Sequence, residues 1–108
     1  MIVSKEHHMQ QHIPKQNPTG FEPPADWQPS FASWRHGGWY VTNVRYNSGA
    51  CGCVSRNYED GKWRIVCDDR RVNIGDPGDV TYKSRDAAAR AEYALAESGK
   101  ARTANKKG

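Results

Sequence analysis

Residues 84–99 read SRDAAARAEYALAESG and form the most clearly marked element of this 108-residue chain. Ser84 is a good N-cap, and Asp86 follows in the first turn, where the helix dipole favours a negative charge. Gly99 comes after the apolar pattern and can supply the left-handed residue that ends a helix. The stretch therefore predicts a helix that starts near Arg85 and ends just before that glycine.

The apolar stripe of this helix consists mostly of alanine. At helical spacing it contains Ala87, Ala88, Ala91, Ala94 and Leu95. Because small side chains let the helix axis approach a sheet closely, the large residues of the core must come from the strands. The side chains expected to be buried together are Val54, Trp63, Ile65 and Leu95.

Upstream of the helix, segments rich in β-branched and aromatic residues predict antiparallel strands. These segments are residues 39–46, 52–58 and 62–68. Turns are indicated at Ser48-Gly49 and Asp60-Gly61, and residues 72–74 can add a short fourth strand before a Gly/Pro-rich loop at 75–78. The predicted fold class is α+β, with a three- to four-stranded antiparallel meander packed against one C-terminal helix.

Two hairpin geometries at Asp60-Gly61 remain open. A two-residue turn pairs Val54 with Cys67, whereas a three-residue turn with a bulge slips one strand by a residue and flips its faces. We favour the first because it gathers apolar residues on one side. With a two-residue Ser48-Gly49 turn, Trp39 and Val41 join the core face, and the opposite face carries Val44 and Arg64.

The chain outside the expected domain of residues 35–99 divides into an arm and a tail. Residues 1–34 carry several prolines and show no apolar periodicity, which predicts an extended N-terminal arm. The aromatic residues of this arm are expected to dock on the domain itself or on a partner. They are Phe21, Trp27, Phe31 and Trp34. Residues 100–108 predict a disordered basic tail.

The net charge of +4 is unevenly distributed along the chain. Residues 1–34 carry two lysines against three acidic residues, residues 35–99 net +1, and residues 100–108 carry four basic residues and no acidic one. Strong counterion release on nucleic-acid binding is therefore expected from the tail alone.

Composition argues against several functional classes. No apolar run approaches the roughly 20 residues that span a bilayer, and residues 1–11 lack the apolar core of a secretory signal. The odd count of three cysteines is not a disulfide framework. So small a domain has little volume for a deep pocket. We expect a soluble cytoplasmic protein with no membrane contact and no small-molecule substrate.

The residues that suggest metal or catalytic chemistry do not form a convincing set. A zinc set would need His36, Cys51, Cys53 and Cys67. The Cys-x-Cys spacing is not a zinc knuckle, and Cys67 is more simply a small buried residue. The four histidines, His7, His8, His12 and His36, all lie outside the expected strands and helix, so no base is placed beside a nucleophile. We expect no catalytic residue, no metal, no cofactor and no enzymatic activity.

Four segments resemble the AP2-type DNA-binding domain and the related arm-binding domains at the N-termini of phage integrases. They are VS at 54–55, GKWRI at 61–65, RVNIG at 71–75 and YKSRDAAARA at 82–91. Order and approximate spacing agree, although residues 76–80 are additional and the strand at 39–46 has no counterpart. In that family three strands are backed by one helix, and the exposed sheet face reads the major groove.

This resemblance implies a small DNA-binding accessory protein whose partner is duplex DNA. The expected contacts are Arg64, Arg71 and Asn73 on the sheet and Lys100, Arg102, Lys106 and Lys107 in the tail. The alternative is a protein-interaction or inhibitor module that meets its partner through the sheet face or the arm. Its expected contacts are Tyr40, Tyr46, Trp27 and Trp34. A continuous positive face would favour DNA, and a mixed face with exposed tyrosines would favour protein.

Overall fold

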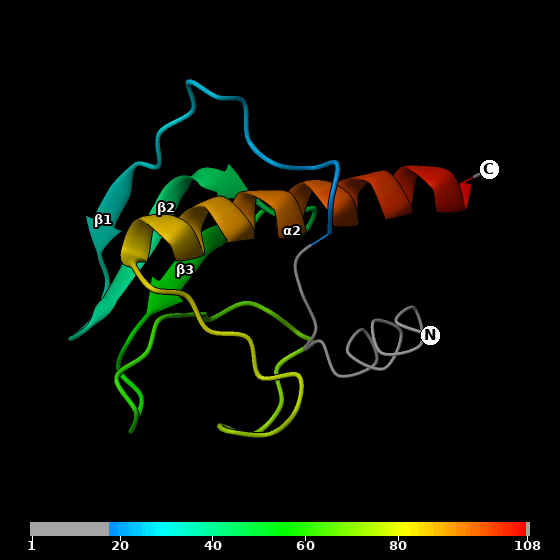
Figure 1. Ribbon diagram of the computed structural model, residues 1–108. Helices are drawn as coiled ribbons and strands as arrows, with labels where there is room; N and C mark the ends of the chain where they lie inside the picture. Colours follow the sequence, from blue (N-terminus) through cyan, green and yellow to red (C-terminus); the bar gives the residue numbers. More distant parts are fainter. Residues whose placement is uncertain (1–17, 108) are drawn as a thin grey trace, which may run out of the picture.

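The computed structural model describes residues 18–107, with side chains as far as Arg102. One antiparallel sheet has the strand order β1-β2-β3-β4, and helix α2 packs across one of its faces (Figure 1). The elements are β1 (Phe31–Ser33), β2 (Gly38–Arg45), β3 (Cys51–Ser55), β4 (Arg64–Ile65) and α2 (Arg85–Lys107). The expected α+β class, an antiparallel sheet against one C-terminal helix, is confirmed.

Strand β1 comes from the segment expected to be an arm. It pairs with β2 at the sheet edge, where Phe31 lies opposite Val41. Just before it, the ring of Trp27 lies 4.9 Å from that of Tyr93 on α2, in an edge arrangement. Between residues 18 and 34 the chain therefore docks on its own domain (Figure 1). The earlier part of the expected arm lies outside the described residues.

The β3–β4 hairpin differs from both turn geometries considered above. Val54 pairs with Ile65 instead of Cys67, because both strands end early and residues 56–63 form a longer connection. The N–H of Arg56 still donates to the carbonyl of Gly37, so the chain keeps contact with the segment before β2 as it leaves β3. The register is shifted by two residues, so the face assignment of Val54 and Ile65 survives.

The expected fourth strand at residues 72–74 does not form. This segment belongs to a loop closed by successive turns, in which the N–H of Asp76 donates to the carbonyl of Asn73. As a result Val72 and Ile74 are 37% and 38% exposed.

A bulge in β2 turns Val44 toward the helix. Val41 pairs with Gly52, but Arg45 pairs with Cys51, so β2 contains extra residues between two neighbouring positions of β3. A bulge of this kind changes which side chains face the core. Val44 is therefore buried, and its expected place on the opposite face is wrong.

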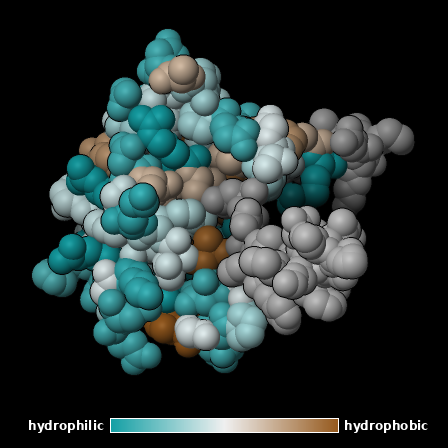
Figure 2. All heavy atoms as spheres, viewed as in Figure 1, coloured by the Kyte–Doolittle hydropathy of each residue, from teal (hydrophilic) through white to brown (hydrophobic). Residues whose placement is uncertain are grey.

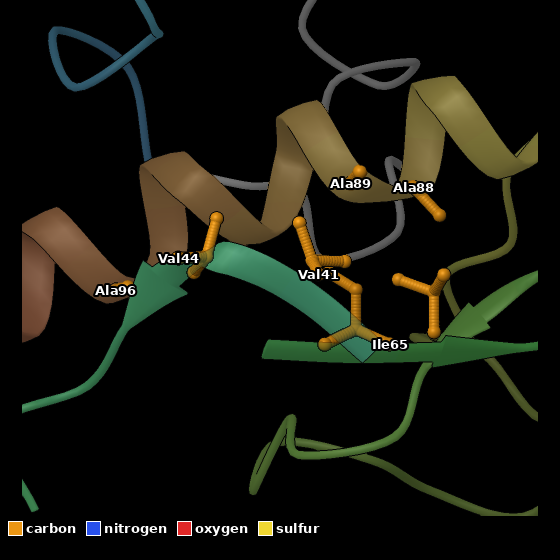
Figure 3. Close-up of a cluster of buried hydrophobic side chains, with 7 residues drawn as sticks. Val41, Val44, Ile65, Ala88, Ala89 and Ala96 are labelled. Atoms are coloured by element: carbon orange, nitrogen blue, oxygen red, sulfur yellow. The ribbon is translucent and has the colours of Figure 1, made fainter. Parts of the chain in front are cut away.

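The core lies between the sheet and α2. Valine and isoleucine side chains from the strands meet alanines from the helix, and Figure 3 shows Val41 and Val44 pointing toward α2. The full cluster is Val41, Val44, Val54, Ile65, Ala88, Ala89 and Ala96. Burial of Val54 with Ile65 is confirmed, whereas Trp63 and Leu95 are only partly buried against this cluster.

Helix α2 does not end before Gly99. It continues to Lys107, and Gly99 does not adopt a positive φ. The side chain of Asn47 donates to the carbonyl of Gly99 at 3.4 Å, and Lys100 pairs with Glu97 one turn back. The expected helix end is therefore wrong, because a glycine without a left-handed backbone does not stop a helix. The expected disorder of the basic tail stays a prediction.

Candidate nucleic-acid interface

The structure places Arg64 inside the molecule, although it lies on the sheet face turned away from α2. Arg64 is next to the core residue Ile65 in β4, so the two side chains point to opposite faces of the sheet, and Arg64 pairs with Ser55 of β3. Arg64 is 3% exposed and Ser55 is also buried. The expectation that Arg64 lies on an exposed sheet face is wrong.

Two carboxylates hold the Arg64 guanidinium. Its Nη1 and Nη2 donate to the two oxygens of Asp60 at 2.8 and 2.9 Å, and its Nε and Nη2 donate to Asp79 at 3.0 and 2.7 Å. These hydrogen bonds hold the pKa of both carboxyls below the usual range and raise the pKa of Arg64. We call Asp60, Arg64 and Asp79 the arginine clamp.

The other expected sheet contacts, Arg71 and Asn73, lie on the loop that follows β4. Both are exposed, and the Arg71 guanidinium donates to the hydroxyl of Tyr58 at 3.3 Å. The same loop carries a close ion pair between Asp68 and Arg70. Charges of both signs are therefore mixed here, and this loop does not present a continuous positive face.

The basic residues expected in a flexible tail stand on the last turns of α2. Lys100 pairs with Glu97 at 2.9 Å, and Arg102 is exposed. The side chains of Lys106 and Lys107 lie outside the described part of the chain. Their backbone continues the helix, which projects past the sheet in Figure 1.

The four aromatic residues of the protein-binding alternative differ in their surroundings. Trp27 packs on Tyr93, and the Tyr46 hydroxyl donates to the carboxylate of Glu92. Trp34 lies over Gly38, where a Cβ would come within 2.6 Å of its ring. Tyr40 is 38% exposed. Trp27 and Tyr46 are thus engaged by contacts within the domain.

A groove that the sequence analysis did not find lies between the β3–β4 connection and the segment leading into α2. Its lining is rich in basic and aromatic side chains and has no acidic residue among those described. The lining consists of Arg56, Gly61, Lys62, Trp63, Thr81, Tyr82 and Lys83. We call it the basic–aromatic groove.

An isolated antiparallel bridge joins the two walls of this groove. Trp63 lies opposite Tyr82, whose N–H donates to the Trp63 carbonyl at 2.9 Å. Side chains at directly opposed positions project to the same side of a ladder. Trp63 and Tyr82 therefore stand next to each other, partly packed on the core and partly lining the groove.

The local sequence explains how each wall forms. On one wall Gly61 adopts a φ of 69° and closes a turn onto the carbonyl of Tyr58, which brings the chain back toward β4. On the other wall Ser84 accepts a hydrogen bond from the N–H of Ala87 and starts α2 immediately after Lys83.

The cations of the groove are not neutralised. Arg56, Lys62 and Lys83 are exposed, and none of the three forms an ion pair with a carboxylate in the described part of the chain. The nearby carboxylate of Asp60 is held by Arg64 in the arginine clamp. The lining of the groove therefore carries three positive charges and no negative one, in a domain that is close to neutral.

The arginine clamp also positions the two walls. Asp60 belongs to the turn before Lys62, and Asp79 belongs to the segment before Thr81. By binding both, the Arg64 guanidinium fixes these segments on either side of the Trp63–Tyr82 bridge. Arg64 thus shapes the groove from the interior without lining it.

A second polar centre lies beneath the helix. Glu92 is 0% exposed, and its carboxyl group accepts hydrogen bonds from the N–H of Cys53, at 2.9 Å, and from the hydroxyl of Tyr46. Burial raises the pKa of Glu92 to about 7, although both hydrogen bonds act in the opposite direction. A Cβ at Gly52 would lie 2.7 Å from Glu92 Oε1, so this glycine makes room for the carboxyl group. Glu92 ties α2 to the irregular end of β3.

The cysteines do not behave as expected from the sequence. Cys67 is exposed rather than buried, and its thiol lies 4.0 Å from the carbonyl of Cys51. Burial raises the pKa of the Cys53 thiol to about 12, which keeps it protonated and weakly nucleophilic. No group of His, Cys, Asp or Glu residues suited to holding a metal ion occurs between residues 18 and 102.

Comparison with known proteins gives no further guide to function. No family model, curated protein or solved structure matches the chain. The resemblance to AP2-type and integrase arm-binding domains stays a prediction. Within the described residues, no helix combines the length and apolar character needed to cross a membrane.

Proposed function

We propose that this protein binds nucleic acid in the basic–aromatic groove. The observation that carries the proposal is the composition of the groove: Arg56, Lys62 and Lys83 form no ion pair in the described part of the chain, and two aromatic side chains line the same groove. Phosphates supply the complementary charge for such a surface, and nucleobases supply flat faces for the aromatic rings. The proposal is for binding alone, without a chemical step.

The surrounding surface supports binding at a defined place. The face of the molecule in Figure 2 is largely hydrophilic, with separate apolar spots instead of one broad apolar patch. Each wall of the groove carries one aromatic residue next to a lysine in the sequence, Trp63 after Lys62 and Tyr82 before Lys83. The arginine clamp lowers the repulsion that a phosphate would meet near this position, since Arg64 offsets one of the two negative charges of Asp60 and Asp79.

The test is fluorescence anisotropy with labelled DNA at about 50 mM salt, where phosphate contacts are strong. The variant Lys62→Ala/Lys83→Ala should weaken binding by at least about tenfold, since two phosphate contacts are lost. The matched control is Arg45→Ala/Arg71→Ala, which removes the same charge from exposed positions outside the groove. It should change the affinity by less than about threefold.

Competition with polyaspartate separates nucleic-acid binding from attraction to any polyanion. Unlabelled DNA should displace the labelled DNA at a much lower concentration than polyaspartate does, because polyaspartate offers no bases to the aromatic rings. Equal losses in the two double variants, or equal competition by both polymers, would contradict the proposal.

One observation favours a protein partner as the second candidate. Val72 and Ile74 are exposed beside Tyr58 and Arg71 in a shallow groove on the loop after β4. Exposed aliphatic, tyrosine and arginine side chains are typical of protein interfaces. If the protein shows no measurable affinity for DNA, binding of a protein partner at this surface becomes the proposed function.

A further inference from the structure

We infer that the basic–aromatic groove takes a single strand of nucleic acid, with unpaired bases stacked on Trp63 and Tyr82. The inference rests on the proposed function and narrows its ligand from nucleic acid in general to an unpaired strand. It also differs from the duplex partner that the sequence resemblance implies.

The shape of the site is the first argument. Proteins that read a duplex insert a protruding helix or ribbon into a major groove about 12 Å wide. Here the cations and aromatic side chains line a hollow between the β3–β4 connection and the segment before α2. A hollow cannot enter a duplex groove, whereas a narrow flexible strand can lie in it.

The arrangement of aromatic and basic residues is the second argument. Trp63 is adjacent to Lys62 on one wall, and Tyr82 is adjacent to Lys83 on the other. Each wall therefore offers one aromatic ring and one cation. Each nucleotide of an unpaired strand presents a base that can stack on the ring and a phosphate that can pair with the cation. In a duplex the bases are stacked on each other, and their faces are not available to these rings.

The closed sheet face is the third argument. Arg64, Ser55 and Cys53 on the side away from α2 are all buried, and Trp34 lies over Gly38 at the same side. Side chains of this face that would have to reach base edges in a major groove are therefore covered.

The experiment compares three probes of similar charge with the full-length protein. They are an oligothymidine of about eight nucleotides, its abasic counterpart with the same phosphates, and a short hairpin duplex. The oligothymidine should bind about tenfold or more tightly than either of the others, since stacking adds to the phosphate contacts. Tryptophan fluorescence should be quenched by oligothymidine in the wild type, and this quenching should be largely lost in Trp63→Phe.

Each outcome bears on a different claim. Equal affinity for the abasic and base-containing strands, or equal or tighter binding of the duplex, would overturn single-strand stacking and leave nucleic-acid binding intact. Undiminished quenching in Trp63→Phe would overturn stacking on Trp63. Failure of all three probes to bind would overturn the proposed function itself. The abasic probe needs no substitution, so the comparison holds even if the variant is unstable.

Discussion

At the scale of single residues, the buried guanidinium of Arg64 holds two carboxylates that belong to separate segments. Arg64→Ala should destabilise the fold by about 3–5 kcal/mol, because Asp60 and Asp79 would be left near each other without a counter-charge. Arg64→Lys should recover only part of this loss, since an ammonium cannot form the paired bonds of a guanidinium. Urea unfolding measures both effects.

The control for this prediction is Arg71→Ala. Arg71 is exposed and has no carboxylate partner within the described residues, so its removal should change stability by less than about 0.5 kcal/mol. An Arg64→Ala protein as stable as the wild type would contradict the prediction.

Glu92 should make stability depend on pH in an unusual direction. Its pKa is about 7 in the folded protein against an ordinary value of 4.5, so between these pH values the folded state retains a proton that the unfolded state has released. Stability from this group is therefore greatest at low pH, falls as pH rises from about 4.5 to about 7, and then stays level. The difference is on the order of 3 kcal/mol.

The variant Glu92→Gln isolates this effect, because glutamine keeps the shape and cannot ionise. Relative to the wild type, it should gain stability as pH rises from 5 to 8. The titratable groups near Glu92 are Tyr46, Cys53, Cys67 and Asp68. The pKa values of the three non-carboxylate groups are raised and that of Asp68 is lowered, so all four titrate outside this window. Parallel stability curves for wild type and variant would contradict the prediction.

At the scale of elements, a substitution at Gly99 tests whether α2 continues through this residue. It is helical, and nothing lies within 4 Å of the Cβ that alanine would add. Gly99→Ala should therefore stabilise the protein by about 0.5–1 kcal/mol and increase its helical circular dichroism. If Gly99 instead ended the helix with a left-handed backbone, alanine would destabilise it.

Gly49 is the matched control for this substitution. It also has open space around its Cβ position, but its φ is 91° in the turn between β2 and β3. Gly49→Ala should destabilise the protein by about 1 kcal/mol, since alanine adopts this backbone reluctantly. Opposite signs for the two alanine substitutions would confirm both backbone assignments.

At the scale of the whole molecule, the two basic regions lie at opposite ends of α2. The basic–aromatic groove precedes Arg85, and the four basic residues after Gly99 lie between 15 and 22 residues further along α2, or about 22–33 Å away. Sites this far apart should contribute independently. A long strand can reach both regions, whereas a short one reaches one at a time.

Deletion of residues 100–108 should therefore weaken binding of an oligothymidine of about 30 nucleotides and leave binding of one of about four nucleotides nearly unchanged. Lys62→Ala/Lys83→Ala should weaken both and reduce the slope of log affinity against log salt by about 1.4, or about 0.7 for each contact. Loss of short-strand binding on deletion would show that the helix end is the main site.

The sequence by itself determined that antiparallel strands precede a single C-terminal helix. The start of α2 follows from Ser84 and Asp86, and β2 follows from its β-branched and aromatic residues, because capping and β-propensity act over a few neighbouring residues. The alanine composition of the helix likewise indicated that strands supply the large core side chains. The end of α2 was missed because a glycine stops a helix only when its backbone turns left-handed, which neighbouring contacts decide.

Only the tertiary structure decided the register, the burial of Arg64 and the candidate site. One wall of the groove contains Lys62 and Trp63, and the other contains Tyr82 and Lys83. The Trp63–Tyr82 bridge and the arginine clamp bring the two walls together. In the sequence, Arg64 is a basic residue next to a strand signal, and nothing local distinguishes an exposed contact from a buried pair. Its position depends on Asp79, fifteen residues away, because an ion pair is set by distance in space and not by distance along the chain.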